Sequence, residues 1–268
     1  MSLRSDSISV IRDGRAILDS VTVELEPARF TAVMGPNGAG KSSLRKTLSG
    51  EWSPDKGSVY LDNTPLHSLP AAVLARRRAV LPQEPRLAFP FSIEEVTRIG
   101  RYPWRGLATP AEDAAAVADA LRAVGLAAPP EALYTRLSGG EKQRLHLARI
   151  LAQLARPAAA PQLPCFLFLD EPTNNLDLAG RQNCLRLARR LADNGTAVFA
   201  ILHDPNDAAR YADNVWLLRD GRLFASGPAE SVLTTPRLSE VFGVPIATAT
   251  ANGTAVFFAR DPSHSPSK

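Results

Sequence analysis

Short apolar runs alternate with turn-forming residues in the first third of the chain, as is typical of β-strands. Residues 7–10 and 21–25 alternate in polarity or carry branched side chains, with an Asp-Gly turn between them. A continuous apolar run at residues 30–34 ends in a glycine-rich loop, and a helix is expected over residues 41–48. This part of the sequence therefore predicts an antiparallel β part followed by a strand, a loop and a helix.

The middle and the last third have other patterns. Residues 82–155 are rich in Ala, Leu and Arg and are expected to be mostly helical, most clearly at residues 111–124. Three prolines make residues 156–164 an exposed loop. Strand-like and helix-like segments then alternate from residues 166–169 to residues 215–218. Such alternation predicts an α/β fold, a mostly parallel sheet flanked by helices.

Composition changes this picture little. The 268 residues are 45% hydrophobic and 22% charged, which suits one large domain with a real interior. The formal charge of +4 is far from that of a nucleic-acid-binding tail, so no nucleic-acid partner is expected. No stretch approaches the ~20 apolar residues that span a bilayer, and the first residues lack the apolar block of a signal peptide. A cytoplasmic chain is expected, with Cys165 and Cys184 as buried free thiols.

A phosphate-binding loop is the first chemical feature. Residues 35–42 fit the pattern G-x-x-x-x-G-K-[ST] in full, between an apolar strand and a helix, although glycine turns also precede helices by chance. Glycines let backbone amides wrap a phosphate, and the helix N-terminus adds partial positive charge. Lys41 would meet the β- and γ-phosphates, and the Ser42 hydroxyl would bind Mg²⁺. The expected ATP-binding residues are Gly35, Pro36, Asn37, Gly38, Ala39, Gly40, Lys41, Ser42 and Ser43.

Two further motifs carry charge or exposed amides. Asp170 and Glu171 end the apolar run at residues 166–169, where acids are costly unless they face a cation or water. Asp170 fits a water-mediated Mg²⁺ partner and Glu171 fits the group that polarises the attacking water; alone, they would be an ordinary strand-end pair. Residues 138–141, Ser-Gly-Gly-Glu, predict a capping box at a helix start and a second anion site made of backbone amides.

The order of these three motifs resembles that of the ABC-type ATPases, over about residues 3–260. The resemblance implies a P-loop NTPase core at residues 1–82 and 160–260 and an inserted helical subdomain at residues 83–159. It also implies two cofactors, ATP and Mg²⁺. The polar residues 261–268 are expected to form a flexible tail.

The same resemblance implies roles for individual residues. Gln83 matches the glutamine that contacts Mg²⁺ and reports on the permease, Asp177 matches the D-loop, and His203 matches the histidine that holds the γ-phosphate. The expected catalytic residues are Glu171, His203 and Gln83, the expected metal-binding residues are Ser42, Gln83 and Asp170, and the expected contacts to ATP from a second copy are Ser138, Gly139, Gly140 and Glu141.

One position departs from the family. An aromatic residue near the first strand usually stacks on adenine, and the aligned position is Val10. With only Ile8 and Val10 to offer apolar contact, weaker nucleotide affinity or looser base selectivity is expected.

In the family, two such domains pair head to tail around ATP. Each chain has one phosphate loop and one copy of the family's signature loop, residues 138–141, so the resemblance implies a homodimer. The helical part is expected to face a transmembrane permease dimer at the cytoplasmic face of a bacterial inner membrane. A periplasmic substrate-binding protein would be an indirect partner. The alternative is that this helical surface is an ordinary solvated face. The basic residues there are Arg76, Arg77, Arg78, Arg86, Arg98, Arg101 and Arg105.

The cargo is indicated less directly. Residues 91–96 and 100–103 are similar to importers of iron-siderophores, cobalamin and haem, and the loop at residues 156–164 is similar to that of the haem-importing members. We therefore expect the ATPase of a haem importer, with siderophore or cobalamin import as the alternative.

Other classes are disfavoured. An ABC ATPase that acts on ribosomes or DNA usually has a second cassette or a long coiled coil. In a P-loop kinase or GTPase the motif at residues 138–141 has no function. An exporter often carries a fused membrane domain.

Overall fold

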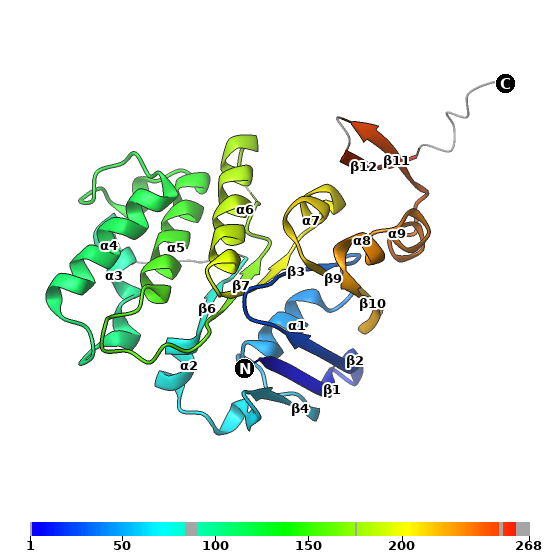
Figure 1. The fold of residues 1–268 in the computed structure, drawn as a ribbon, viewed down its shortest axis with the longest axis horizontal. Coiled ribbons are helices and arrows are strands. Elements are labelled where there is room, and N and C mark those ends of the chain that lie inside the picture. Colours follow the sequence, from blue (N-terminus) through cyan, green and yellow to red (C-terminus); the bar gives the residue numbers. More distant parts are fainter. Residues whose placement is uncertain (1, 84–89, 175, 252–253, 261–268) are drawn as a thin grey trace.

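The computed structural model describes residues 2–83, 90–174, 176–251 and 254–260 (Figure 1). The expected tail at residues 261–268, Arg86 and Asn175 of the D-loop lie outside the described residues.

A six-stranded sheet forms the centre of the molecule, in the order β10-β9-β3-β8-β7-β6. Five strands are parallel: β3 (Phe30–Met34), β6 (Arg78–Leu81), β7 (Phe166–Asp170), β8 (Ala197–Ile201) and β9 (Asn214–Arg219). β10 (Arg222–Pro228) pairs antiparallel with β9 at one edge. Strands β3, β7 and β8 are buried along their whole length, because helices or strands cover both faces. The predicted α/β class is confirmed.

A smaller antiparallel sheet packs against one face of the central sheet. Its order is β2-β1-β4-β5, with β1 (Leu3–Arg12), β2 (Arg15–Leu25), β4 (Lys56–Leu61) and β5 (Thr64–Pro65). Helix α1 (Lys41–Leu48) shares the core between the two sheets, where its Leu44 and Leu48 pack with Val33 and Phe168 of the central strands. The predicted N-terminal antiparallel part is confirmed, and α1 has the predicted bounds.

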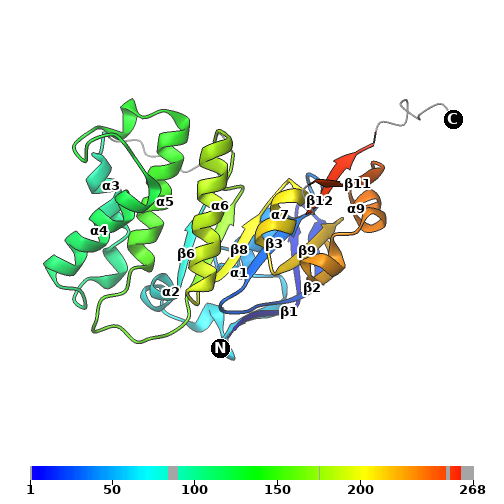
Figure 2. The same ribbon diagram turned by 45° about the horizontal axis from the view of Figure 1, so that its top comes forward.

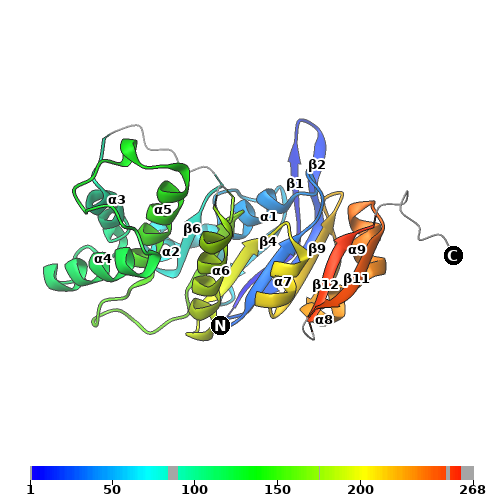
Figure 3. The same cartoon turned by 90° about the horizontal axis from the view of Figure 1, so that it is seen from above.

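Helices cover the opposite face of the central sheet (Figures 2 and 3). They are α6 (Leu178–Asp193), α7 (Pro205–Tyr211), α8 (Ala229–Val232) and α9 (Thr235–Phe242). A C-terminal hairpin of β11 (Ile246–Ala251) and β12 (Thr254–Ala259) packs beside α7 and α9. Asn206 of α7 holds this hairpin through two hydrogen bonds, to the carbonyl oxygen and from the amide of Phe257.

A helical lobe lies beside the β6 edge of the sheet (Figure 1). It contains α3 (Ile93–Ile99), α4 (Pro110–Val124) and α5 (Gly139–Leu154), and α2 (Ala71–Arg77) leads into β6. Short 3₁₀ turns lie at Leu66–Ser68, Tyr102–Trp104 and Tyr134–Arg136. Each of the three lobe helices begins with a capping box, from Ser92, Thr109 or Ser138 to the glutamate three residues later. The predicted capping box at Ser138 is therefore confirmed.

The basic surface expected on this lobe is smaller than its arginine count suggests. Arg77 and Arg101 are buried, at 8% and 3% exposed, and pair with Asp62 and Asp113. Arg78 is half-buried at the start of β6. The Arg77 and Arg101 guanidinium groups support the fold, so the prediction that these two belong to a basic docking face was wrong; Arg98 and Arg105 are exposed.

Both cysteines are buried free thiols, as predicted. Burial raises the pKa of the Cys184 thiol to about 12. In the described parts of the chain, no helix is long and apolar enough to cross a bilayer.

Buried His146 of α5 makes stability depend on pH. The side chain is 2% exposed and its Nε2 lies 3.2 Å from the Tyr134 hydroxyl. Burial lowers the pKa of His146 from 6.5 to about 4, and the charge of Arg149 adds to this shift. Between these two pH values the unfolded chain binds more protons than the folded one, so this contribution to stability is complete above pH 6.5 and declines as the pH falls towards 4.

We expect His146→Gln to remove this pH dependence. The wild type should lose about 2 kcal/mol of unfolding free energy through this residue between pH 7 and pH 4.5, and the variant should not. Urea unfolding at both pH values gives the loss of unfolding free energy for each protein. Subtracting the variant's loss from the wild type's leaves the contribution of His146, because the other titrating groups are the same in both proteins. An equal loss in both proteins would contradict the assignment.

Candidate functional site

The predicted site residues follow four neighbouring strands. The phosphate loop follows β3, His203 follows β8, Asp170 and Glu171 stand at the end of β7, and Gln83 follows β6. These strands are adjacent and parallel in the order β3-β8-β7-β6, so their carboxyl ends share one edge of the sheet. Sites in open parallel sheets form at this edge.

The phosphate loop needs glycine at two positions for steric reasons. Gly35 has φ 147°, and a Cβ there would lie 2.1 Å from the carbonyl oxygen of Leu218. Gly40 has φ 97°, and a Cβ there would lie 2.8 Å from the carbonyl oxygen of Ile17. The loop is therefore held tightly between β2 and β9, with its backbone leading directly into α1.

Lys41 points back over this loop. Its Nζ donates to the carbonyl oxygens of Gly35 at 2.7 Å and Pro36 at 2.9 Å, and the side chain is buried. Burial lowers the pKa of Lys41, while the nearby carboxylates of Glu171 and Asp170 act to raise it. The ammonium is thus fixed at the mouth of the loop, where a phosphate would meet it.

Ser42 and Asp170 form a pair of oxygen donors beside Lys41. The Ser42 hydroxyl donates to Asp170 Oδ1 at 3.2 Å, and Arg45 Nε donates to Asp170 Oδ2 at 2.9 Å. Burial raises the pKa of Asp170, and the charge and hydrogen bond of Arg45 oppose that rise. Hydroxyl and carboxylate oxygens are the ligands that Mg²⁺ prefers in proteins, so this donor set fits a magnesium ion.

Glu171 collects three partners from three segments of the chain. Gln83 Nε2 and Asn174 Nδ2 donate to Oε2 at 2.8 and 2.5 Å, and His203 Nε2 lies 2.9 Å from Oε1. The Glu171 backbone has φ +51°, a conformation that non-glycine residues rarely adopt and that occurs at functional sites. The structure therefore brings together all three predicted catalytic residues, Glu171, His203 and Gln83.

The signature motif lies elsewhere. Ser138–Glu141 begin α5, and the described hydrogen bonds of the Ser138 and Glu141 side chains join these two residues to each other. The N-terminus of α5 is in the helical lobe, whereas the phosphate loop begins α1 in the core (Figure 1). One copy of the chain does not bring the two predicted anion sites together.

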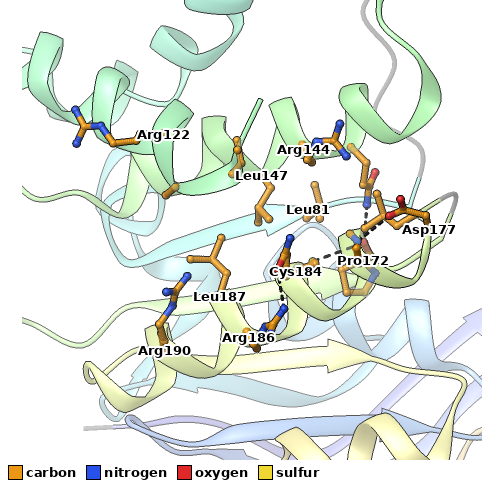
Figure 4. A pocket seen from close by; sticks show the side chains of 18 residues that line it. Leu81, Arg122, Arg144, Leu147, Pro172, Asp177, Cys184, Arg186, Leu187 and Arg190 are labelled. Carbon is orange, nitrogen blue, oxygen red and sulfur yellow. Dashed lines mark hydrogen bonds between the residues drawn. The ribbon is translucent and has the colours of Figure 1, made fainter. Parts of the chain in front are cut away.

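A cleft of about 460 Å³ separates the lobe from the core (Figure 4). One of its lining residues is Pro172, whose carbonyl oxygen accepts a hydrogen bond from Gln143 Nε2 of α5 at 3.2 Å and lies 3.7 Å from Cys184 Sγ of α6. Pro172 directly follows Glu171. The signature helix α5 is therefore bonded to the loop that carries the candidate water-activating carboxylate.

The D-loop residue Asp177 borders this cleft and caps α6. Its Oδ1 accepts a hydrogen bond from the Gly180 amide at 2.7 Å.

The adenine contact predicted for Ile8 and Val10 is wrong. Both side chains are 0% exposed and belong to the core between the sheets. Register shifts in β1 on either side of Val10 turn Ile8, Ser9 and Val10 inward in succession, whereas Ile11 is 38% exposed. Val10 therefore gives no information about base stacking.

Three residues near the site were missed. Arg45 contacts Asp170, Asn174 contacts Glu171, and Gln143 contacts the Pro172 carbonyl oxygen. The position of Arg45 could have been predicted from its spacing. It lies four residues after Lys41 and three before Leu48, so it shares the inward face of α1 with them. Asn174 and Gln143 have no such signal, because their partners are fixed by loop geometry.

Comparison with known proteins agrees with this geometry. The sequence profile described as ABC transporter matches residues 18–174, more than half of the chain. The chain belongs to the ABC transporter family, as the cassette that binds and hydrolyses ATP.

Curated relatives narrow the class further. The chain is 42% identical over 246 residues to the Hemin import ATP-binding protein HmuV of Rhodococcus jostii, covering 92% of this chain and 81% of the relative. It is 46% identical over 243 residues to the protein of the same name from Gloeobacter violaceus, covering 90% and 87%.

A solved structure is also similar over nearly the whole chain. This transporter, described as being of the metal-chelate type and seen in an inward-facing conformation, is 25% identical with a TM-score of 0.78 over 98% of each chain.

We expect Val10→Tyr to damage the core without improving ATP binding. The larger ring must fit between two sheets, so the unfolding free energy should fall by about 1–3 kcal/mol or more. Ile11→Tyr, at an exposed neighbour, is the matched control and should leave stability unchanged. Denaturant unfolding and direct ATP titration measure both properties. Unchanged stability with tighter ATP binding in Val10→Tyr would contradict the structure.

We expect Glu171→Gln to bind ATP but to hydrolyse it about a hundredfold more slowly or worse, because the neutral amide cannot polarise water. Steady-state phosphate release and ATP-dependent dimerisation in light scattering measure the two properties, and the variant should accumulate as an ATP-bound dimer. Glu240→Gln, at an exposed carboxylate of α9, is the control. Normal hydrolysis by Glu171→Gln would show that another group activates the water.

Proposed function

We propose that this chain is the ATP-hydrolysing subunit of an importer that carries haem through a separate transmembrane permease. The observation that carries this proposal is its 39–46% identity to Hemin import ATP-binding proteins HmuV from several bacteria, over about nine-tenths of the chain. The site geometry supports ATP hydrolysis, and the relatives indicate haem as the transported molecule.

The site suits ATP hydrolysis. The amides of residues 35–43 and the Lys41 ammonium would bind the phosphates, and His203 would contact the γ-phosphate from the end of β8. Glu171 would accept the proton of the attacking water, and the hydrogen bond between Gln83 and Glu171 would let that glutamine sense the reaction.

Mg²⁺ would be held by Ser42 and Asp170, with Gln83 close by through its bond to Glu171. A bound Mg²⁺ supplies positive charge that neutralises the phosphate oxygens. Lys41 and the loop amides would bind the same phosphates, and together these residues would hold the γ-phosphate near Glu171.

The complete site requires two copies of the chain. Because Ser138, Gly139 and Gly140 lie on the lobe, away from the phosphate loop of the same chain, we propose that they contact the ATP held by a second copy. ATP between two copies would then close a homodimer, and loss of the γ-phosphate would release it.

The two parts of the fold suggest separate functions. We assign residues 1–82 and 160–260 to the nucleotide-binding core and residues 83–159 to the lobe that faces the permease. The exposed Arg98 and Arg105, with Tyr102 at 63% exposed, lie on this lobe. The subunit would act at the cytoplasmic face of a bacterial inner membrane, and a periplasmic binding protein would deliver the cargo to the permease.

The alternative cargo is another iron chelate or cobalamin. The likeness to a transporter described as of the metal-chelate type supports keeping this class as the second candidate.

We expect the complex with its permease, reconstituted in lipid vesicles, to hydrolyse ATP several-fold faster when haem-loaded binding protein is added. Binding proteins loaded with cobalamin or a ferric siderophore are the competitors, and a complex that carries Glu171→Gln is the control for contaminating ATPase activity. Stimulation by a competitor and not by haem would overturn the haem assignment and leave the ATPase assignment intact.

A further inference from the structure

Arg45 is a buried charge inside the nucleotide-binding core. It lies on α1, three residues after Ser42, and is only 2% exposed. A guanidinium group stays charged in proteins, and a buried charge is strongly destabilising unless it is paired. The residues that pair with Arg45 therefore matter to the site.

The Arg45 guanidinium bridges two carboxylates. Nε donates to Asp170 Oδ2 at 2.9 Å, while Nη1 and Nη2 donate to Glu51 Oε1 and Oε2 at 2.5 and 3.2 Å. Ser49 Oγ also donates to Glu51 Oε1 at 3.0 Å. Glu51 is the outer member, with 38% of its side chain exposed, whereas Asp170 has 3%.

This bridge decides which oxygen of Asp170 faces the phosphate loop. Oδ2 is occupied by Arg45, so Oδ1 is the oxygen that lies beside the Ser42 hydroxyl. Arg45 thus holds the Asp170 carboxylate through the oxygen that points away from Ser42, and the described contacts of Arg45 do not include the phosphate loop.

We propose that the Arg45–Glu51 pair sets, through its charge beside Asp170, how strongly the ATP site binds Mg²⁺. The inference rests on the proposed binding of Mg²⁺ by Ser42 and Asp170. Arg45 brings a positive charge towards the cation, and Glu51 compensates for that charge.

Counting charges gives a distinctive expectation. Asp170, Arg45 and Glu51 together carry one net negative charge. Glu51→Gln removes it and leaves Arg45 uncompensated, Arg45→Met raises it to two, and the double variant restores it to one. The affinity for Mg²⁺ should follow this order, because charges in a partly buried site interact strongly.

Half-buried Arg78 also lies near Glu51, and its charge acts to lower the pKa of that carboxyl. An ordinary structural ion pair gives another pattern, in which each single variant weakens binding and the double variant does not recover.

The test is direct binding of a non-hydrolysable ATP analogue to the full-length protein, titrated with Mg²⁺ and monitored by calorimetry. Glu51→Gln should raise the half-saturating Mg²⁺ concentration about tenfold. Arg45→Met should lower it, and the double variant should return to within about twofold of the wild type. Binding of the analogue in EDTA should be alike in all four proteins.

Asp113→Asn is the matched control. Asp113 compensates Arg101, an equally buried arginine in the helical lobe, with 26% of the Asp113 side chain exposed. This variant should leave the Mg²⁺ titration unchanged while lowering the thermal midpoint, as Glu51→Gln should also do. If Arg45→Met does not fold, Glu51→Gln and the double variant still carry the test.

Two results separate the possible failures. An unchanged Mg²⁺ titration in Glu51→Gln, or a double variant weaker than both single variants, would overturn the inference and leave the site intact. Analogue binding by the wild type that is the same with Mg²⁺ and with EDTA would overturn the proposed magnesium site itself.

Discussion

Parallel register is the constraint on which the site depends. Four adjacent strands, β3, β8, β7 and β6, run in the same direction, so the segments that follow them emerge at one edge. Residues separated by more than a hundred positions, such as Gln83 and His203, thereby reach the same carboxylate of Glu171. An antiparallel neighbour at any of these positions would have sent its residues to the opposite edge. Among the described strands of the central sheet, only β10 is antiparallel, and it lies at the edge opposite β6.

Helix α5 joins the signature half to the catalytic half. Its Gln143 donates to the Pro172 carbonyl oxygen, next to Glu171. Further along the helix, Ile150 belongs to the core of the central sheet and Leu147 packs against α6. Such a link suits a motor in which contact with a second copy must be communicated to the carboxylate.

The sequence was informative wherever one local rule decides the structure. Steric demand fixes the glycines of the phosphate loop, hydrogen bonding fixes the capping boxes, and continuous apolar runs fix β3, β7 and β8. Long-range pairing was not readable in the same way. β6 has only four residues, and β10 contains a glycine and a proline and is half-exposed, so neither has a clear strand pattern. The inward turn of Val10 depends on register shifts against β2, and the burial of Arg77 depends on distant Asp62.

The C-terminal hairpin has a practical consequence for measuring motion. Its strand β12 is hydrogen-bonded to Asn206, three residues after His203, so the end of the described chain is joined to the segment that carries the histidine and not to the helical lobe. A fluorescent label attached near residue 258 would therefore move with the core. Paired with a second label on α4, it would report any change in the distance between the core and the helical lobe.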